Sequence, residues 1–408
     1  MSEGQNPPRV LLTNAEERSI LAACRSLHSA DYAVSAVSFA PFAATHWSRA
    51  CTERLRMVDP EHDTERFVED LRQQLTRRRY AVLVPGSDRA LLAISRGRER
   101  LEGLTRLGLP APASVERSLD RDVMAEVAAT VGFSPAESIR CTNLEEGRAA
   151  ARALGFPLIL KAPRTASQVD GAIQQTHPSR RIATEEELAE ALPAYPGVFL
   201  AQRVEAGLPL SFAGVMAGGR LLAVAVARYS RTWPVSAGNA AFAETIAAAP
   251  MLEEMVQTFL TGLGWEGIFE LELIQATEDR FVPIDFNPRP YGSMTLAAAA
   301  GAPLTAIWCN WLLGRNPHPV RARPGYLYRC EDADLRHLLW QLRHGNLRAT
   351  FDIARPRRTV AHAYFRIADP LPLFVRGLSM ARTRVTMGRP TIDSAPAPTA
   401  SAREPPPA

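Results

Sequence analysis

The sequence contains almost no lysine. Of its 47 lysines and arginines, Lys161 is the single lysine. Genome base composition is the simplest cause of such a bias, so a lysine that survives it needs a reason. A compact ammonium reaches phosphate oxygens that a planar guanidinium does not fit. Lys161 also ends the apolar run Pro157 to Leu160. A charge at the end of a buried strand requires a charged partner, so we prefer a functional role to chance survival.

Paired cysteines, a signal sequence and a nucleic-acid signature are also missing. The five cysteines, at positions 24, 51, 141, 309 and 330, have neither close pairs nor zinc spacing, which predicts buried thiols in a reduced compartment. The first residues are polar and lead directly into a strand, so we expect no secretory signal. A formal charge of +4 without a basic, aromatic-rich run is too weak to indicate nucleic acid. We therefore expect a cytoplasmic protein.

No uninterrupted apolar run is long enough for a membrane. The most apolar stretch, residues 294–313, approaches transmembrane length, but Gly301, Pro303 and Asn310 interrupt it. We therefore predict a buried pair of helices and no membrane span.

The N-terminal part alternates between strand and helix patterns. The expected elements are strands at 9–13, 33–39 and 81–85 and helices at about 15–27 and 63–77. This alternation predicts an α/β domain with an open parallel sheet, ending near residue 114 before a proline-containing linker at 109–113. Asp88 follows the third strand, at the edge where such sheets bind ligands. We expect Asp88 to be a helix N-cap rather than a substrate contact.

Acidic side chains alternate with apolar ones between Gly267 and Ser293. Residues two apart on a strand share a face, so Glu270 projects with Glu272, and Asp285 projects with Asn287. If the two strands pair, one face carries three carboxylates and an amide, which suits Mg²⁺ or Mn²⁺. The strand pattern alone favours the alternative, a solvated face of a hairpin.

Residues 285–289, Asp-Phe-Asn-Pro-Arg, resemble the metal-binding strand of the ATP-grasp superfamily. The resemblance implies ATP and two Mg²⁺ (or Mn²⁺) ions, held by Asp285, Asn287 and an acid of the preceding strand. Spacing places that acid at Glu272, with Glu270 as the alternative. Arg289, held between two prolines, would stabilise the transferred phosphoryl group.

The resemblance also implies a nucleotide site. Lys161, at the end of a strand, and Arg121, at the start of a helix, would hold the phosphates. The family covers them with a glycine-rich flap, whereas residues 164–182 contain one glycine, Gly171. Whether this flap closes normally over ATP stays open.

The hinge between the two lobes of the fold resembles residues 202–207. The resemblance places Gln202 there and implies that the backbone of Arg203 and Val204 meets adenine. Pro209 stands at or near the position of the usual ribose-binding acid, and we offer Glu205 as its substitute.

Two arginines, Arg228 and Arg231, stand where the family contacts its acyl substrate. They are either a pocket for an acid or a strand edge packed on the core, with no preference between the two.

The resemblance implies a Mg²⁺-dependent ligase that activates a carboxylic acid as an acyl phosphate for attack by an amine, less commonly a thiol. A carboxylase of the biotin-dependent or carbamoyl-phosphate type is the first alternative, but it needs further basic groups and the chain has no second lysine. A non-catalytic nucleotide-binding regulatory protein is the second. The acid, the amine and the pathway stay open, and so does a homodimer.

We predict four parts of the chain. They are an α/β domain (1–114), an ATP-grasp domain (115–315, with a small lobe at about 125–201 and a metal-binding lobe at about 202–315), a small arginine-rich helical appendage (316–376) and a disordered tail (377–408).

Overall fold

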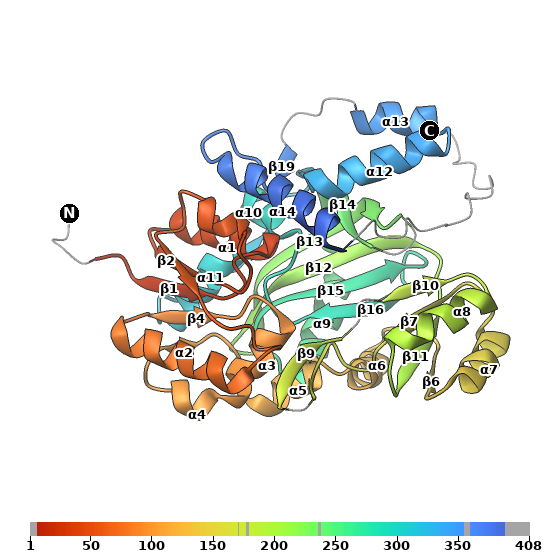
Figure 1. Cartoon of the computed structure of the whole chain (residues 1–408), viewed down its shortest axis with the longest axis horizontal. Coiled ribbons are helices and arrows are strands. Elements are labelled where there is room, and N and C mark those ends of the chain that lie inside the picture. Colours follow the sequence, from red (N-terminus) through yellow and green to blue (C-terminus); the bar gives the residue numbers. More distant parts are fainter. Residues whose placement is uncertain (1–5, 170, 177–178, 236–237, 355–359, 388–408) are drawn as a thin grey trace.

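The structure is a computed structural model that describes residues 6–169, 171–176, 179–235, 238–354 and 360–387. Within these ranges the chain forms three larger sheets and a separate two-stranded hairpin. The N-terminal sheet lies at one end of the molecule and the small lobe at the other, with the largest sheet between them (Figure 1). The mixed α/β fold class predicted from the sequence is confirmed.

The N-terminal sheet is entirely parallel, in the order β3-β2-β1-β4-β5. Its strands are β1 (Arg9–Leu12), β2 (Ala33–Ser38), β3 (Glu53–Arg56), β4 (Val82–Val84) and β5 (Arg106–Leu107). The helices are α1 (Arg18–His28), η1 (Ala44–Trp47), α2 (Thr64–Arg77), α3 (Asp88–Arg96) and α4 (Arg98–Leu101). The predicted open parallel sheet is thus confirmed, although the short strands β3 and β5 were not predicted.

Asp88 begins helix α3 but does not cap it. The N-cap is Ser87, whose Oγ accepts a hydrogen bond from the backbone N–H of Ala90 at 3.2 Å. The expectation that Asp88 is the N-cap is therefore wrong. The chain order reverses between β1 and β4, which places the start of α3 at the ligand-binding edge of the sheet.

The small lobe is an antiparallel sheet in the order β10-β7-β11-β6. Its strands are β6 (Ser138–Cys141), β7 (Leu158–Lys161), β10 (Arg180–Ile182) and β11 (Phe199–Arg203), and its helices are α7 (Leu144–Leu154), α8 (Glu185–Ala191) and η2 (Leu192–Ala194). Two further helices, α5 (Pro112–Ser118) and α6 (Arg121–Thr130), precede it. Helix α5 begins inside the predicted linker at 109–113, and Asp120 caps α6.

The expected flap contains a β-hairpin. Strands β8 (Ala166–Val169) and β9 (Ala172–Gln175) pair with each other in antiparallel fashion. The side chain of Ile173 is fully buried. Its backbone N–H donates to Thr64 Oγ1 at 2.9 Å and approaches the Pro60 carbonyl oxygen at 3.2 Å. The hairpin is therefore docked on the N-terminal domain in this structure.

The central sheet has the order β16-β15-β12-β13-β14-β18-β19, with β17 paired to β13. Its strands are β12 (Leu208–Ala217), β13 (Arg220–Trp233), β14 (Asn239–Ile246), β15 (Gly267–Gln275), β16 (Phe281–Asn287), β17 (Val320–Arg321), β18 (Leu327–Arg329) and β19 (Val360–His362). The predicted pairing of β15 with β16 is confirmed, with Glu272 opposite Asp285 and Glu270 opposite Asn287.

Helices cover the central sheet. These are α9 (Pro250–Leu263), α10 (Met294–Ala299) and α11 (Leu304–Leu312). Phe269 and Phe286 of the β15–β16 hairpin are buried, and the Phe286 ring meets that of Phe259 on α9 edge to face. The predicted buried pair of helices at 294–313 is confirmed as α10 and α11. Within the described ranges, no helix has the length and apolar character needed to cross a membrane.

Residues 316–376 are joined to the central sheet. Strands β17, β18 and β19 extend it, and helices α12 (Glu331–Arg343), α13 (Leu347–Ala354) and α14 (Leu371–Met387) lie along its upper side in Figure 1. Helix α14 also includes residues 377–387, which were predicted as part of a disordered tail. The rest of that tail, residues 388–408, lies outside the described residues.

Candidate active site

Four polar side chains lie on the β15–β16 hairpin in the arrangement that alternation predicts. Glu272 pairs in register with Asp285, and Glu270 with Asn287. Their apolar neighbours Phe269 and Phe286 are buried in the core. Strand periodicity alone therefore brings three carboxylates and an amide to one region.

Glu270 is a buried hydrogen-bond acceptor. One oxygen accepts from Ser211 Oγ at 2.6 Å and from the Tyr229 hydroxyl at 2.9 Å, and the other accepts from Asn287 Nδ2 at 3.0 Å. Burial raises the pKa of Glu270, while the Ser211 and Tyr229 hydroxyls act to lower it. With three donors already in place, Glu270 joins the hairpin to the neighbouring strands β12 and β13.

Glu272 differs from Glu270 because, within the described part of the chain, its carboxylate accepts no hydrogen bond. Burial and then the charges of Glu270 and Asp285 raise the pKa of Glu272 well above its usual value, while Lys161 and Arg289 act to lower it. Glu272 is thus the carboxylate of the hairpin whose negative charge is least compensated.

Lys161 and Arg121 converge on Asp285 from the small lobe and α6. Arg121 donates through Nη2 to Asp285 Oδ1 at 3.1 Å and through Nη1 to the Ala162 carbonyl at 2.9 Å. Lys161 Nζ donates to the Ile284 carbonyl at 2.5 Å. Burial lowers the pKa of Lys161 to about 8, with Asp285 opposing this shift. Two cations and an acid from three distant segments therefore meet at one place.

The oxygen atoms of Glu272, Asp285 and Asn287 are the candidate ligands for the expected metal. No group of three or more His, Cys, Asp or Glu side chains that could hold a metal ion is found among the described residues. Glu272, Asp285 and the amide of Asn287 are nevertheless hard oxygen donors, and Mg²⁺ is usually held by one or two carboxylates together with nucleotide phosphates. A cation beside Glu272 would also offset the repulsion that raises its pKa. The residues present fit Mg²⁺ when phosphate oxygens complete its coordination.

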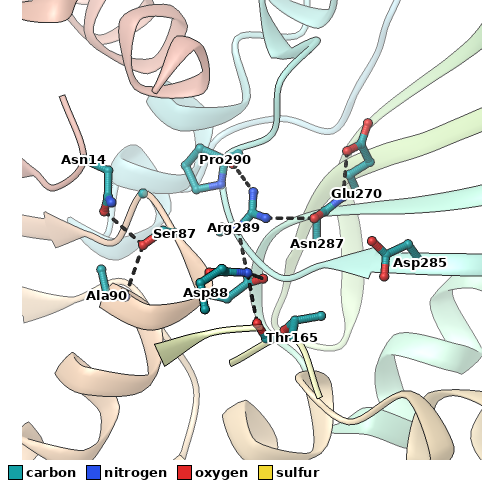
Figure 2. Close-up of polar contacts among 12 residues, drawn as sticks. Asn14, Ser87, Asp88, Ala90, Thr165, Glu270, Asp285, Asn287, Arg289 and Pro290 are labelled. Atoms are coloured by element: carbon teal, nitrogen blue, oxygen red, sulfur yellow. Dashed lines mark hydrogen bonds and ion pairs between the residues drawn. The ribbon is translucent and has the colours of Figure 1, made fainter. Parts of the chain in front are cut away.

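Arg289 leaves the hairpin toward the N-terminal domain (Figure 2). Its Nε donates to Asp88 Oδ1 at 2.6 Å, its Nη2 to Asn287 Oδ1 at 3.0 Å and its Nη1 to the Pro290 carbonyl at 3.2 Å. A guanidinium has five N–H donors, so one donor remains on Nη1 and one on Nη2. The side chain is 21% exposed. It can therefore still bind an anion.

The predicted hinge residues lie at the end of β11, which Gln202 and Arg203 close, and directly after it. Gln202 donates through Nε2 to Ser138 Oγ at 3.0 Å. The backbone N–H of Arg203 donates to the Glu137 carbonyl at 2.9 Å and is not free for adenine. Val204 is half-buried. Glu205 forms an ion pair with Arg280 at 3.2 Å, so a ribose would have to compete with that arginine.

The structure does not bring Arg228 and Arg231 to the carboxylates of the hairpin. Tyr229 points toward Glu270, so Arg228, its neighbour on the strand, projects from the opposite face of the sheet. Arg228 lies 3.5 Å from Glu244. Arg231 is bound to Asp334 of α12 through two hydrogen bonds of 2.7 and 3.0 Å. Both arginines are therefore engaged elsewhere.

Sequence reasoning missed the partners of the predicted residues. It gave no role to Ser211 or Tyr229, which bind Glu270, and a minor one to Asp88, which binds Arg289. The position of Asp88 at the end of a parallel strand was the available signal. Its burial, at 2% exposure of the side chain, could not be read from the sequence.

Comparison with solved structures identifies the fold. The structure is similar to N5-carboxyaminoimidazole synthetase from Staphylococcus aureus complexed with ADP, with a TM-score of 0.61 at 12% identity over 80% of this chain and 82% of that one. It is also similar to L-amino acid ligase from Bacillus licheniformis, with a TM-score of 0.59 at 14% identity over 76% and 75% of the two chains.

A third similar structure is the biotin carboxylase domain of 2-oxoglutarate carboxylase from Hydrogenobacter thermophilus, in complex with MgADP, ADP and bicarbonate. Its TM-score is 0.59 at 16% identity, over 79% of this chain and 74% of that one. No protein-family model and no curated protein matches the sequence. The structural likeness confirms the fold expected from residues 285–289. The chain therefore has the ATP-grasp fold.

Proposed function

We propose that the chain is an ATP-dependent ligase that joins a carboxylic acid to an amine through an acyl phosphate. One observation carries the proposal: Lys161 and Arg121 converge on Asp285, beside a half-buried Glu272 whose negative charge is poorly compensated. Basic side chains can bind the phosphates of ATP directly. The neighbouring carboxylates can bind the same phosphates through a metal ion.

The residues divide into three roles. Lys161 and Arg121 hold the phosphates of ATP, and Gln202 to Glu205 border the nucleotide at the edge of β11. Glu272, Asp285 and Asn287 would hold Mg²⁺, which supplies neutralising charge to the phosphate oxygens when bound. Arg289 offers its two remaining N–H donors to the acid or to the phosphoryl group in transfer.

The reaction needs no nucleophile from the protein. A carboxylate oxygen of the acid attacks the γ-phosphorus, the bond to the oxygen bridging the β- and γ-phosphates breaks, and ADP leaves. The amine nitrogen then attacks the acyl carbon, inorganic phosphate leaves, and the nitrogen loses a proton as the amide forms. The part played by the protein is positioning and charge stabilisation, the usual means of catalysis for phosphoryl transfer.

The names of the similar structures support both an amino-acid ligase and a carboxylase. The test therefore measures products. Carboxylic acids are screened with hydroxylamine in place of the amine, and ADP and hydroxamate are measured together. The proposal expects at least one acid to give both in equal amounts, in wild type and not in Lys161→Ala.

Bicarbonate as the only acid serves as the comparison. ADP formed with bicarbonate, without hydroxamate from any other acid, would favour a carboxylase. ATP binding without acid-dependent ADP formation would favour a regulatory nucleotide-binding protein.

A further inference from the structure

Asp88 and Arg289 form a buried ion pair between two parts of the fold. Asp88 begins α3 in the N-terminal domain, whereas Arg289 follows strand β16 of the central sheet. Arg289 Nε donates to Asp88 Oδ1 at 2.6 Å, and the Asp88 side chain is 2% exposed. The position of Arg289 thus depends on the N-terminal domain as well as on its own strand.

The pairing fixes which edge of the guanidinium faces a ligand. Asp88 binds the Nε edge, so the remaining N–H donors belong to Nη1 and Nη2. Asn287 and the Pro290 carbonyl take the other donor of each of these nitrogens. In Figure 2, Asp88 and Asn287 lie on different sides of the Arg289 guanidinium. Without Asp88, rotation of the side chain would turn a different edge toward the acid.

The second oxygen of Asp88 meets the flap. Gln175, the last residue of β9, donates through Nε2 to the Thr165 carbonyl at 2.9 Å and approaches Asp88 Oδ2 at 3.5 Å. The same hairpin buries Ile173 against the N-terminal domain. The Asp88 carboxylate therefore contacts both the β8–β9 hairpin and Arg289.

We propose that Asp88 is a positioning residue that couples docking of the β8–β9 hairpin to the orientation of Arg289. The catalytic part of this inference rests on the proposed ligase function. When the hairpin docks, Gln175 holds Asp88, and Asp88 turns the Nη edge of Arg289 toward the acid. When the hairpin leaves, Asp88 is free to move and Arg289 loses that orientation.

The kinetic test is a double-mutant cycle between Asp88→Asn and Gln175→Ala, with ADP and hydroxamate as readouts. Because misplacement of a reacting group by about 1 Å can cost 10²-fold, we expect Asp88→Asn to lower kcat by about 30- to 100-fold. The KM for ATP should change by less than about 3-fold, since Asp88 contacts Arg289 and Gln175 but neither Lys161 nor Arg121.

Non-additivity is the decisive outcome of the cycle. Gln175→Ala should lower kcat by about 3- to 10-fold in wild type and by less than about 2-fold in Asp88→Asn, because residues in one network do not add. Asp88→Glu, which keeps the charge, should recover part of kcat. Equal effects of Gln175→Ala in both backgrounds, or a loss seen only in the KM for ATP, would overturn the proposal.

A second measurement does not depend on turnover. Hydrogen exchange of residues 166–169 and 171–175 should be faster in Asp88→Asn and in Arg289→Gln than in wild type. The control Asp332→Asn removes an Asp–Arg pair with Arg376 in the C-terminal region, and it should leave exchange of the hairpin unchanged. Unchanged exchange in Arg289→Gln would overturn the coupling. Faster exchange in an enzyme that forms no ADP with any acid would retain the coupling and reject the ligase.

Discussion

Arg231 of β13 is held by Asp334 of α12 in a two-point ion pair, Nε to Oδ1 at 2.7 Å and Nη2 to Oδ2 at 3.0 Å. Both side chains are largely buried, at 12% and 5% exposure. Arg329 lies 2.9 Å from the same carboxylate, and the Arg231 guanidinium stacks over the Phe242 ring at 4.2 Å. Arg231, which the sequence left open as a substrate contact or as part of a packed strand edge, thus joins helix α12 to the central sheet.

Loss of this arginine should therefore reduce stability. Arg231→Ala leaves a buried Asp334 with Arg329 alone, and removal of one partner of a buried pair costs about 3 to 5 kcal/mol in general; the remaining Arg329 should reduce this cost. Arg228→Ala removes a half-exposed guanidinium 3.5 Å from Glu244 and should cost less than about 1 kcal/mol. Chemical denaturation measures both variants. A normally stable Arg231→Ala protein with a raised KM for the acid would instead restore the substrate role.

Lys161 should be required for binding of the nucleotide. Its ammonium is buried, bonds to the Ile284 carbonyl and lies in the field of Asp285. Lys161→Ala should weaken ATP binding by roughly 1.5 to 3 kcal/mol, the scale of a charge-assisted contact. Lys161→Arg should recover only part of the affinity, because a planar fork does not replace a point charge. Calorimetric titration with ATP provides the measurement. Wild-type affinity in a folded Lys161→Ala protein would remove this residue from the site.

Much of this site could be predicted because strand periodicity is local information. Alternation between Gly267 and Asn287 places Glu270, Glu272, Asp285 and Asn287 correctly, and register then brings them into pairs. The parallel N-terminal sheet could be predicted because the alternation of strand and helix segments is also visible in the local sequence.

The ion pairs that decide the role of each arginine could not be predicted. Arg289 and Asp88 are 201 residues apart, and Arg231 and Asp334 are 103 apart. An arginine bound to a buried carboxylate has the same local sequence pattern as one that awaits a ligand. In a chain with so many arginines, only the tertiary contacts tell the two cases apart.

Substitution of the two glutamates of β15 should have different effects, on turnover at Glu272 and on stability at Glu270. Glu272→Gln and Asp285→Asn preserve shape and remove charge, so we expect normal folding and a loss of Mg²⁺-dependent turnover by several orders of magnitude. Glu270→Gln is the matched control: it disturbs three hydrogen bonds from Ser211, Tyr229 and Asn287, and it should mainly lower thermal stability. Turnover at varied Mg²⁺ and a melting curve separate these effects. Near-native turnover in both Glu272→Gln and Asp285→Asn would show that these carboxylates only form a polar strand face and do not bind the metal.

Arg289 should be required for transfer but not for binding of ATP. Its free N–H donors belong to Nη1 and Nη2, which we propose bind the acid, whereas we assign the phosphates to Lys161 and Arg121. Arg289→Ala would also leave Asp88 buried without its partner, and the resulting destabilisation would confuse the result. Arg289→Lys is therefore the more informative change, because an ammonium can still pair with Asp88 but lacks the fork that binds a carboxylate or phosphoryl group at two points.

We expect Arg289→Lys to melt close to wild type and to bind ATP normally. Its acid-dependent ADP formation should fall by at least about 10²-fold, the cost of removing one preorganised donor from a developing charge. Calorimetry, melting curves and ADP assays on the same preparation measure the three quantities. If Arg289→Lys retained acid-dependent turnover, a point charge would suffice at this position and the two-point recognition of the acid by Arg289 would be wrong.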